Sequence, residues 1–287
     1  MLKEDLVLIS TEDSEQIALW KIQSTDQQNN SNVFLTHGTF SDKRICLGIA
    51  KYLAEIGYTC WIMEWRNHGA SPNTTNKFNF ETIGLYDIKA AFKHLVHTLN
   101  ISHLHCITHS GGGICLTMFL IKNPSYKNCI NSISIFACQA FGAAKSSLSY
   151  ISLVVTKSLI KLFGVFPASK NGQPHDETYY TMKQWYGWNI NKEFKGSDGY
   201  DYLSRMENIR IPILSVCAKG DNYVAPKIGC KSFLDAFKNP LNQLVYCSKE
   251  DGYLEDYDHG RILLSSSAAQ ELWPVVRGWM EGYGGKR

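Results

Sequence analysis

The chain has 287 residues, of which 44% are hydrophobic, with 29 basic and 26 acidic side chains. This length suits one large α/β domain with an insertion. The formal charge of +3, without any run rich in lysine or arginine, argues against a nucleic-acid partner.

The cysteines and the apolar segments bear on location. Met1–Leu6 carries acids where a signal peptide would have cationic and then apolar residues. Apolar runs stay well below the ~18 residues that a membrane span needs. The nine cysteines form no C-x-x-C pair and no zinc-like cluster with histidine, and several, such as Cys106 and Cys217, fall in predicted buried strands. We therefore expect reduced thiols, a cytoplasmic location and no stable membrane insertion.

Short β-branched and apolar runs alternate with longer helical patterns along most of the chain. This alternation predicts an α/β fold with a mostly parallel central sheet flanked by helices. Predicted strands cover 6–10, 17–22, 33–36, 59–63, 104–108, 130–136, 213–218 and 243–247; predicted helices cover 44–56, 83–99, 111–120 and 275–281.

Between Ala137 and about Arg205 the alternation stops. We expect residues 137–205 to form a helical cap inserted into a core made of 1–136 and 206–287, with a simple continuation of the core as the alternative. An aromatic-rich segment covers 179–188, and a second set of apolar residues recurs at helical spacing: Leu148, Ile151, Val155, Leu159 and Leu162, with Lys157 and Lys161 opposite them. We expect both sets to roof the site.

The strongest local signal is a serine between a predicted strand and a glycine-rich helix start, in Cys106-Ile-Thr-His-Ser-Gly-Gly-Gly113. A tight strand-to-helix turn strains the serine and pushes its hydroxyl out of the sheet, as in a nucleophile elbow. Small neighbours are needed because two backbone segments nearly touch there, and Gly112 meets that need. Thr108 replaces the usual glycine of G-x-S-x-G. Ser110 is the candidate nucleophile.

An acid and a base follow Ser110 in the chain order serine, acid, histidine. Asp221 follows the predicted strand 213–218 through a Gly-Asp-Asn turn, so it lies at the sheet edge from which the serine emerges. His259 follows the last predicted strand and precedes the closing helix. The separation of Ser110 from Asp221 leaves room for a cap.

With these residues in place, nearly the whole chain resembles the α/β-hydrolase esterase/lipase family. Thr36-His-Gly-Thr-Phe40 is similar to the family's His-Gly oxyanion loop, and Trp65-Arg-Asn-His-Gly-Ala-Ser71 resembles its R-x-x-G-x-S loop. The resemblance implies that the backbone N–H groups of Thr39 and Gly111 hold a tetrahedral oxyanion. A weaker resemblance concerns quorum-quenching N-acyl-homoserine lactonases of this fold.

Other acids and histidines compete for the roles of Asp221 and His259. We expect the histidines of the two family-like loops to bond backbone, and the histidine before Ser110 to point away from the nucleophile. The competing acids are Asp251, Asp256 and Asp258, and the competing histidines are His37, His68 and His109.

These roles predict a serine hydrolase that cleaves a carboxylic ester or lactone through an acyl-enzyme, with no metal and no organic cofactor. Phe40 and Phe141 flank the expected acyl pocket, which favours a lipophilic small-molecule substrate such as an N-acyl-homoserine lactone or a monoacylglycerol-type ester. An acyltransferase, an aminopeptidase using the anionic pair Asp176 and Glu177, and a non-catalytic ligand-binding homologue are the alternatives. The sequence leaves the oligomeric state open.

Overall fold

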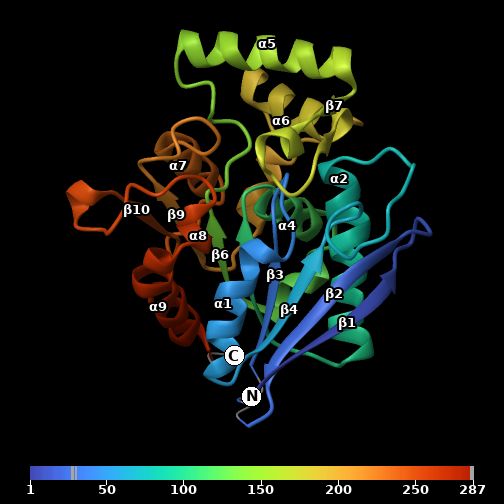
Figure 1. The fold of residues 1–287 in the computed structure, drawn as a ribbon, viewed down its shortest axis with the longest axis vertical. Coiled ribbons are helices and arrows are strands. Elements are labelled where there is room, and N and C mark those ends of the chain that lie inside the picture. Colours follow the sequence, from blue (N-terminus) through green and yellow to red (C-terminus); the bar gives the residue numbers. More distant parts are fainter. Residues whose placement is uncertain (27–28, 30, 285–287) are drawn as a thin grey trace.

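An eight-stranded sheet forms the centre of the molecule, in the strand order β1-β2-β4-β3-β5-β6-β9-β10 (Figure 1). The computed structural model describes residues 1–26, 29 and 31–284. Strands β4, β3, β5, β6, β9 and β10 run parallel to one another, whereas β2 is antiparallel to both β1 and β4. The strands are β1 (Leu2–Ser10), β2 (Gln16–Ser24), β3 (Asn32–Thr36), β4 (Thr59–Glu64), β5 (Leu104–His109), β6 (Ile130–Phe136), β9 (Ile213–Ala218) and β10 (Gln243–Cys247).

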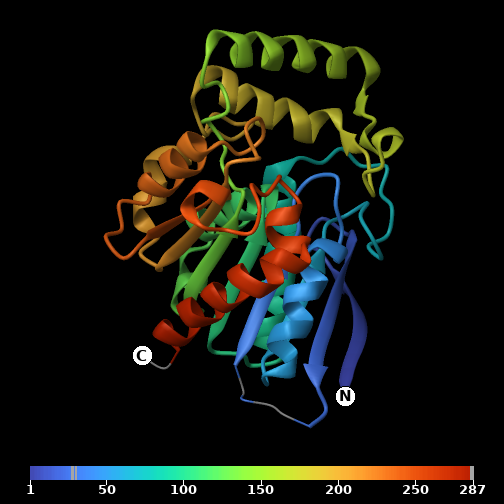
Figure 2. The same cartoon turned by 60° about the vertical axis from the view of Figure 1, so that its left-hand side comes forward.

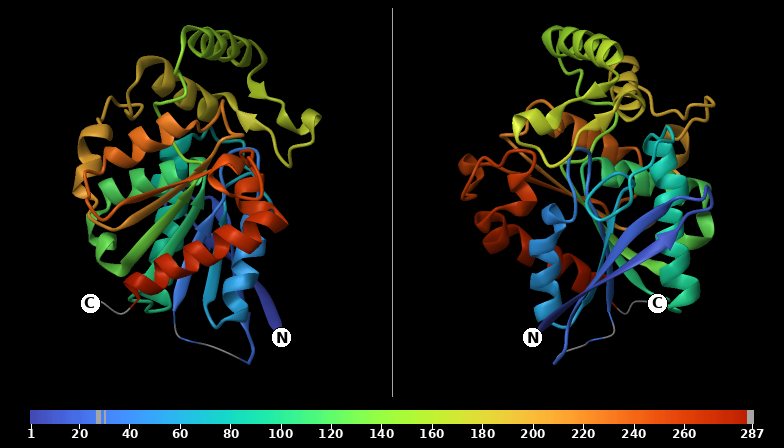
Figure 3. Two further views of the ribbon diagram at one scale, coloured as in Figure 1. Left: turned by 90° about the vertical axis from the view of Figure 1, so that its left-hand side faces the viewer. Right: turned by 45° about the vertical axis from the view of Figure 1, so that its right-hand side comes forward.

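Helices cover both faces of this sheet (Figures 1 and 3). One buried cluster joins the sheet to α1, α8 and α9, and a second joins its other face to α2, α3 and α4. The helices are α1 (Arg44–Glu55), α2 (Phe80–Thr82), α3 (Lys89–Lys93), α4 (Gly111–Lys122), α7 (Lys227–Asp235), α8 (Arg261–Leu264) and α9 (Ser266–Tyr283).

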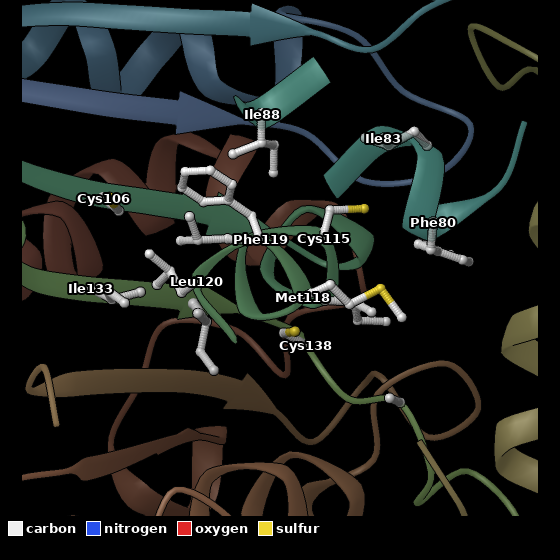
Figure 4. Close-up of a cluster of buried hydrophobic side chains, with 14 of the residues drawn as sticks. Phe80, Ile83, Ile88, Cys106, Cys115, Met118, Phe119, Leu120, Ile133 and Cys138 are labelled. Carbon is white, nitrogen blue, oxygen red and sulfur yellow. The ribbon is translucent and has the colours of Figure 1, made fainter. Parts of the chain in front are cut away.

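The core beneath α4 shows why the central strands are so apolar. Figure 4 shows Met118 and Phe119 of α4 among the side chains of the neighbouring helical segment and of β5 and β6. Every residue of β5 is buried, because α4 covers one face of the strand and the α1 side covers the other. Parallel strands buried on both faces appear in a sequence as continuous apolar runs.

The predicted fold is confirmed: the strands and helices form where the patterns place them, with bounds that differ by a few residues. The helix expected over 83–99 forms with two wider π-helical stretches, η1 (Ile83–Ile88) and η2 (His94–Thr98), on either side of α3. All nine cysteines are free and buried. In the part of the chain that the structure describes, no helix has the length and apolar character that crossing a bilayer requires.

Residues 137–205 leave the sheet after β6 and return to it at β9. They form α5 (Ser147–Phe163), β7 (Val165–Phe166), β8 (Glu177–Thr178) and α6 (Tyr179–Asn191). Figures 1 and 2 show α6 between α5 and the rest of the molecule, so that α5 is the outermost helix. The division of the chain into core and cap domains stays a prediction.

The expectation that the apolar stripe of α5 roofs the site is wrong. Leu148, Leu159 and Leu162 are exposed, whereas Leu153 and Ile160 are the buried side chains of this helix. Helical spacing identifies residues that share a face, but it does not say what that face contacts. Here α6 contacts the narrower inward face, and the wide apolar stripe faces away from the core.

A buried ion pair ties the loop after β4 to the helical segment that follows it. Arg66 contacts Asp87 of η1 at 2.6 Å and Asp13 at 2.7 Å. Arg66 and Asp87 are almost completely buried. Two charges withdrawn from water are stable only while both partners are present. The R-x-x-G-x-S-like loop therefore has a structural anchor at its arginine.

We predict that Arg66→Met lowers the free energy of unfolding by about 3–5 kcal/mol, because it leaves a carboxylate buried without its partner. Urea denaturation monitored by fluorescence measures the change. Arg277→Met is the matched control: Arg277 forms an exposed pair with Glu281, so its loss should cost less than about 1 kcal/mol. Equal effects of the two substitutions would contradict the anchor.

Candidate active site

Ser110 occupies the sharp turn between β5 and α4. Its backbone has φ 51° and ψ −122°, a conformation that is strained for any residue with a Cβ. The Ser110 N–H donates to the Phe136 carbonyl at 2.8 Å, and the Ser110 carbonyl accepts from the Gly113 N–H at 3.0 Å. These bonds hold the strained turn between two buried segments, as the nucleophile-elbow motif requires.

Glycines make this turn possible by close approach. A Cβ on Gly38 would lie 2.6 Å from the Ser110 Cβ, and one on Gly112 would lie 2.6 Å from the His37 carbonyl oxygen. A Cβ on Gly113 would lie 3.1 Å from the Thr108 Oγ1. The Cys138 Sγ would lie closer still, at 2.6 Å, so the third glycine of the run leaves space for both Cys138 and Thr108.

The structure brings His259 and Asp221 to Ser110. The His259 Nε2 lies 2.9 Å from the Ser110 Oγ, and the His259 Nδ1 lies 2.5 Å from the Asp221 Oδ2. The other Asp221 oxygen accepts from the N–H groups of Val224 and Ala225, both at 3.1 Å. The three predicted side chains therefore form one hydrogen-bonded chain.

Asp221 is held in its charged form. Burial alone would raise the pKa of its carboxyl, but the bonds from His259 and from the backbone N–H groups of Ala225 and Val224 outweigh burial and lower the pKa below its ordinary value. A carboxylate in this place fixes the imidazole with its Nδ1 protonated, which leaves Nε2 free to accept a proton from Ser110.

The competing acids are occupied elsewhere in the histidine loop. Asp258 accepts from the Gly260 and Arg261 N–H groups at the start of α8, and Asp256 accepts from the Lys249 N–H. Asp251 bonds Ser248. The structure brings none of these three carboxylates into contact with His259.

Of the competing histidines, His37 and His68 bond backbone as expected. His37 accepts from the Trp65 N–H at 3.1 Å, and His68 contacts the Arg66 carbonyl at 2.9 Å. Burial holds the pKa of His37 well below its ordinary value. Burial would also lower the pKa of His68, but Glu177 at 3.0 Å outweighs it and raises that pKa.

His109 is a contributor to the site that the sequence analysis missed. Its Nε2 lies 2.7 Å from the His259 carbonyl oxygen. Burial, with His259 nearby, lowers the pKa of His109 to about 3, so the ring is neutral and Nε2 donates. His109 thereby holds the backbone of the residue that contacts Ser110. Its position directly before Ser110 was the available signal.

The amides of Thr39 and Gly111 flank Ser110. Both residues line the cavity that contains the Ser110 side chain. Neither N–H group has an acceptor among the described residues, although the adjacent Phe40 N–H donates to Glu177 at 3.2 Å. Two unpaired amides beside one hydroxyl are suited to bind an anionic oxygen.

The cavity beside Ser110 has a volume of about 200 Å³ and a mainly apolar wall. Phe40 lines it, as expected, and the segment 137–205 contributes Phe166, Met182, Trp185 and Tyr186. The aromatic segment at 179–188 therefore does contact the site, unlike the outer stripe of α5.

Phe141 is not brought to this cavity. It is partly buried between other rings, 6.5 Å from the Phe194 ring and 5.9 Å from the Phe233 ring. The expectation that it flanks the acyl pocket is corrected: closeness to the end of β6 in sequence does not determine where a side chain packs.

A second, larger cavity of about 680 Å³ lies on the His259 side of the site. It shares Thr39, Phe40, Phe166 and Val224 with the first cavity, and it adds polar groups from the histidine loop. Ser110 and His259 thus lie between an apolar space and a more polar one. Within the described residues, no group of three or more histidine, cysteine or acidic side chains could hold a metal ion.

Comparisons with known proteins agree with this architecture. The sequence profile of the alpha/beta hydrolase fold matches residues 32–140. The chain has the α/β-hydrolase fold. No curated protein sequence matches it significantly.

Solved structures with the α/β-hydrolase fold superpose on nearly the whole chain. An esterase of Pyrococcus furiosus is 18% identical, with a TM-score of 0.66, over 99% of this chain and 92% of its own. An esterase of Exiguobacterium antarcticum is 14% identical, with a TM-score of 0.65, over 96% and 99%. A thermophilic esterase of Thermogutta terrifontis is 12% identical, with a TM-score of 0.63, over 97% and 99%. At these identities the likeness concerns the fold.

We predict that His109→Ala slows the labelling of Ser110 by a fluorophosphonate by about ten- to a hundredfold, because small displacements of a reacting group have effects of this size. The rate is measured by mass spectrometry over time. His109→Gln should restore most of the rate, since its amide can donate to the same carbonyl. His105→Ala, which removes another buried neutral histidine of β5, is the control and should leave the rate unchanged. No rescue by glutamine would contradict the positioning role.

Proposed function

We propose that this protein is a serine hydrolase that cleaves a carboxylic ester or lactone with a lipophilic acyl group. The observation that carries the proposal is the hydrogen-bonded chain from Asp221 through His259 to Ser110, which ends on a strained serine at the wall of a cavity. A serine in this arrangement has an adjacent base and a backbone that presents its hydroxyl to a ligand.

In the proposed reaction, His259 removes the Ser110 proton while the Ser110 oxygen attacks the acyl carbonyl carbon. The tetrahedral intermediate collapses as His259 returns that proton to the departing alkoxide, and the acyl-enzyme remains. Water, deprotonated by His259, then attacks the acyl carbon and releases the acid and free Ser110. Asp221 orients the imidazole and stabilises its cationic form. Every proton is carried by protein or water, so the reaction needs no cofactor.

The Thr39 and Gly111 amides have the proposed role of an oxyanion hole. Their N–H groups lie beside Ser110 without protein acceptors among the described residues, so binding a developing oxyanion costs them no existing bond. One preorganised donor of this kind contributes about 2.7–4 kcal/mol to the stability of a transition state.

The cavity wall supports a lipophilic acyl group. Its lining side chains, taken from the described residues, carry no charge, and aromatic rings make up much of its surface. An N-acyl-homoserine lactone and a monoacylglycerol-type ester both offer an apolar chain next to a cleavable ester carbonyl. We propose that residues 137–205 act as a cap on a core of 1–136 and 206–287, since Phe166 and Trp185 close this wall.

Three alternative functions fit the structure less well or equally well: an aminopeptidase, a non-catalytic homologue and an acyltransferase. An aminopeptidase needs an anion near the substrate amine, but Asp176 is exposed and bonds the Ser169 N–H, while Glu177 is buried against His68. A non-catalytic homologue has no need of a strained serine bonded to histidine. An acyltransferase would use the same acyl-enzyme with an alcohol in place of water, and the larger cavity is compatible with such an acceptor.

The nine free, buried cysteines support a reducing compartment, and we propose a cytoplasmic location on that ground. The substrate is the partner that this proposal requires.

The proposed roles are tested by hydrolysis of p-nitrophenyl butyrate. Ser110→Ala should abolish turnover, and Asp221→Asn should lower kcat by about 10⁴-fold, because the amide leaves the imidazole in the wrong tautomer. Asp256→Asn is the control: its carboxylate accepts from the Lys249 N–H and makes no hydrogen bond to His259, so kcat should stay close to that of the wild type. A larger loss in Asp256→Asn than in Asp221→Asn would refute the assigned acid, and turnover by Ser110→Ala would refute the nucleophile.

A separate prediction concerns acyl chain length. We expect kcat/KM to rise from acetyl to octanoyl esters, by at most about fourfold for each methylene that the cavity buries. Met182→Trp, which fills the cavity, should flatten this gradient and leave acetate hydrolysis nearly unchanged. Leu159→Ser on the exposed face of α5 is the control and should preserve the gradient with these soluble esters. A preference of the wild type for acetyl esters would contradict the lipophilic substrate.

A further inference from the structure

The outer face of α5 is an apolar surface with no partner among the described residues. Six large side chains on it are exposed: Leu148 (81%), Ile151, Val155, Leu159, Leu162 (78%) and Phe163 (68%). They repeat at intervals of three and four residues except for the terminal phenylalanine, so they share one side of the helix for its whole length. Figures 1 to 3 show this helix at the far end of the molecule from the termini. A continuous exposed patch of this kind marks an interaction site.

The charge around this face has one sign. Residues 137–175 contain four lysines and no aspartate or glutamate. The formal charge of this segment therefore exceeds the +3 of the whole chain. Lys145 and Lys161 are exposed, whereas Lys157 is half-buried beside α6. None of these three lysines forms a salt bridge with a residue that the structure describes. Other surface lysines have an acid beside them, for example Lys219, which is paired with Glu250. Lys145 in the loop before α5 and Lys161 near the end of its polar side are therefore exposed cations without a carboxylate partner among the described residues.

This surface also continues into the candidate active site. Phe163 ends α5 on the exposed side, and Gly164, at φ 75°, turns the chain into β7. Three residues after Phe163, Phe166 lines the cavity beside Ser110 and packs against Phe40 at 5.0 Å between ring centroids. A short segment of the chain thus connects the exposed face of α5 to the wall of the cavity.

We infer that α5 binds an anionic lipid surface, with its apolar face in the interfacial region and with Lys145 and Lys161 near the lipid phosphates. Helices that lie in the plane of a membrane interface combine a strong apolar face with flanking lysines, and anionic headgroups supply the missing counter-charge. A second copy of this chain would instead bring two sets of unpaired lysines together. This binding goes beyond the proposed function. Its consequence, that an acyl substrate enters the cavity from the lipid phase, rests on the proposed function.

Co-sedimentation of the full chain with vesicles tests the inference. One set of vesicles contains phosphatidylcholine alone, and the other contains equal parts of phosphatidylcholine and phosphatidylglycerol. We expect stronger binding to the anionic vesicles, and we expect added salt to weaken it. Lys161→Glu should weaken binding by at least about fivefold, and Leu159→Ser with Leu162→Ser should weaken it by more than about tenfold.

Matched controls separate this face from surface properties in general. Leu241→Ser with Leu254→Ser removes two half-exposed leucines elsewhere, and Lys93→Glu reverses an exposed lysine of α3; none should alter binding. All variants should hydrolyse p-nitrophenyl butyrate in solution like the wild type, which shows that they fold. If the wild type binds vesicles without hydrolysing this ester, the proposed function fails and the inference stands.

Two outcomes would overturn the inference. One is the absence of binding to anionic vesicles, or binding that is equal for both vesicle types and insensitive to salt. The other is a dimer in light scattering that Leu159→Ser with Leu162→Ser dissociates, with no vesicle binding by the monomer, which would make this face a contact between copies of the chain.

Discussion

The candidate site depends on a backbone conformation that Ser110 cannot maintain by itself. Its φ of 51° is unfavourable for a serine, and it persists because the His37–Thr39 loop and the start of α4 approach each other almost to contact. Gly38 and Gly112 permit this approach, and any side chain at either position would separate the two segments. The same contact sets the distance between the two flanking amides and the serine oxygen. The contacts that stabilise this turn are therefore the same contacts that determine the geometry of the site.

The sequence is sufficient to predict the residues whose positions follow from strand ends. Ser110, Asp221 and His259 each follow a strand that can be recognised from its apolar pattern, and the ends of parallel strands meet along one edge of a sheet. The order serine, acid, histidine along the chain is also the order in which this fold presents a catalytic triad. The overall architecture is predictable for a similar reason, since alternating patterns of period two and period 3.6 determine which element each segment forms.

Contacts that depend on loop conformation could not be predicted. The bond from His109 to the His259 carbonyl and the bonds of Glu177 to His68 and to the oxyanion-loop backbone join residues more than a hundred positions apart, with no shared pattern in the sequence. Phe141 shows the converse: a residue near the site in sequence packs into an aromatic cluster instead. For α5, the amphipathic pattern predicted the helix correctly, but the apolar side does not face the site as expected. The pattern contains no information on what covers the apolar side.

The uncharged wall of the cavity affects the substrate and the product of an ester hydrolysis differently. A neutral ester loses little hydration when it enters a space lined by phenylalanine, methionine and tryptophan, whereas the carboxylate formed from it would give up strong hydration there. Among the residues that the structure describes, no cation lines this cavity to compensate the anion. Under the proposed function, only the Thr39 and Gly111 amides of this wall could hold the carboxylate of the acid product, while the rest of the wall favours its return to water. Solvation would then assist product release.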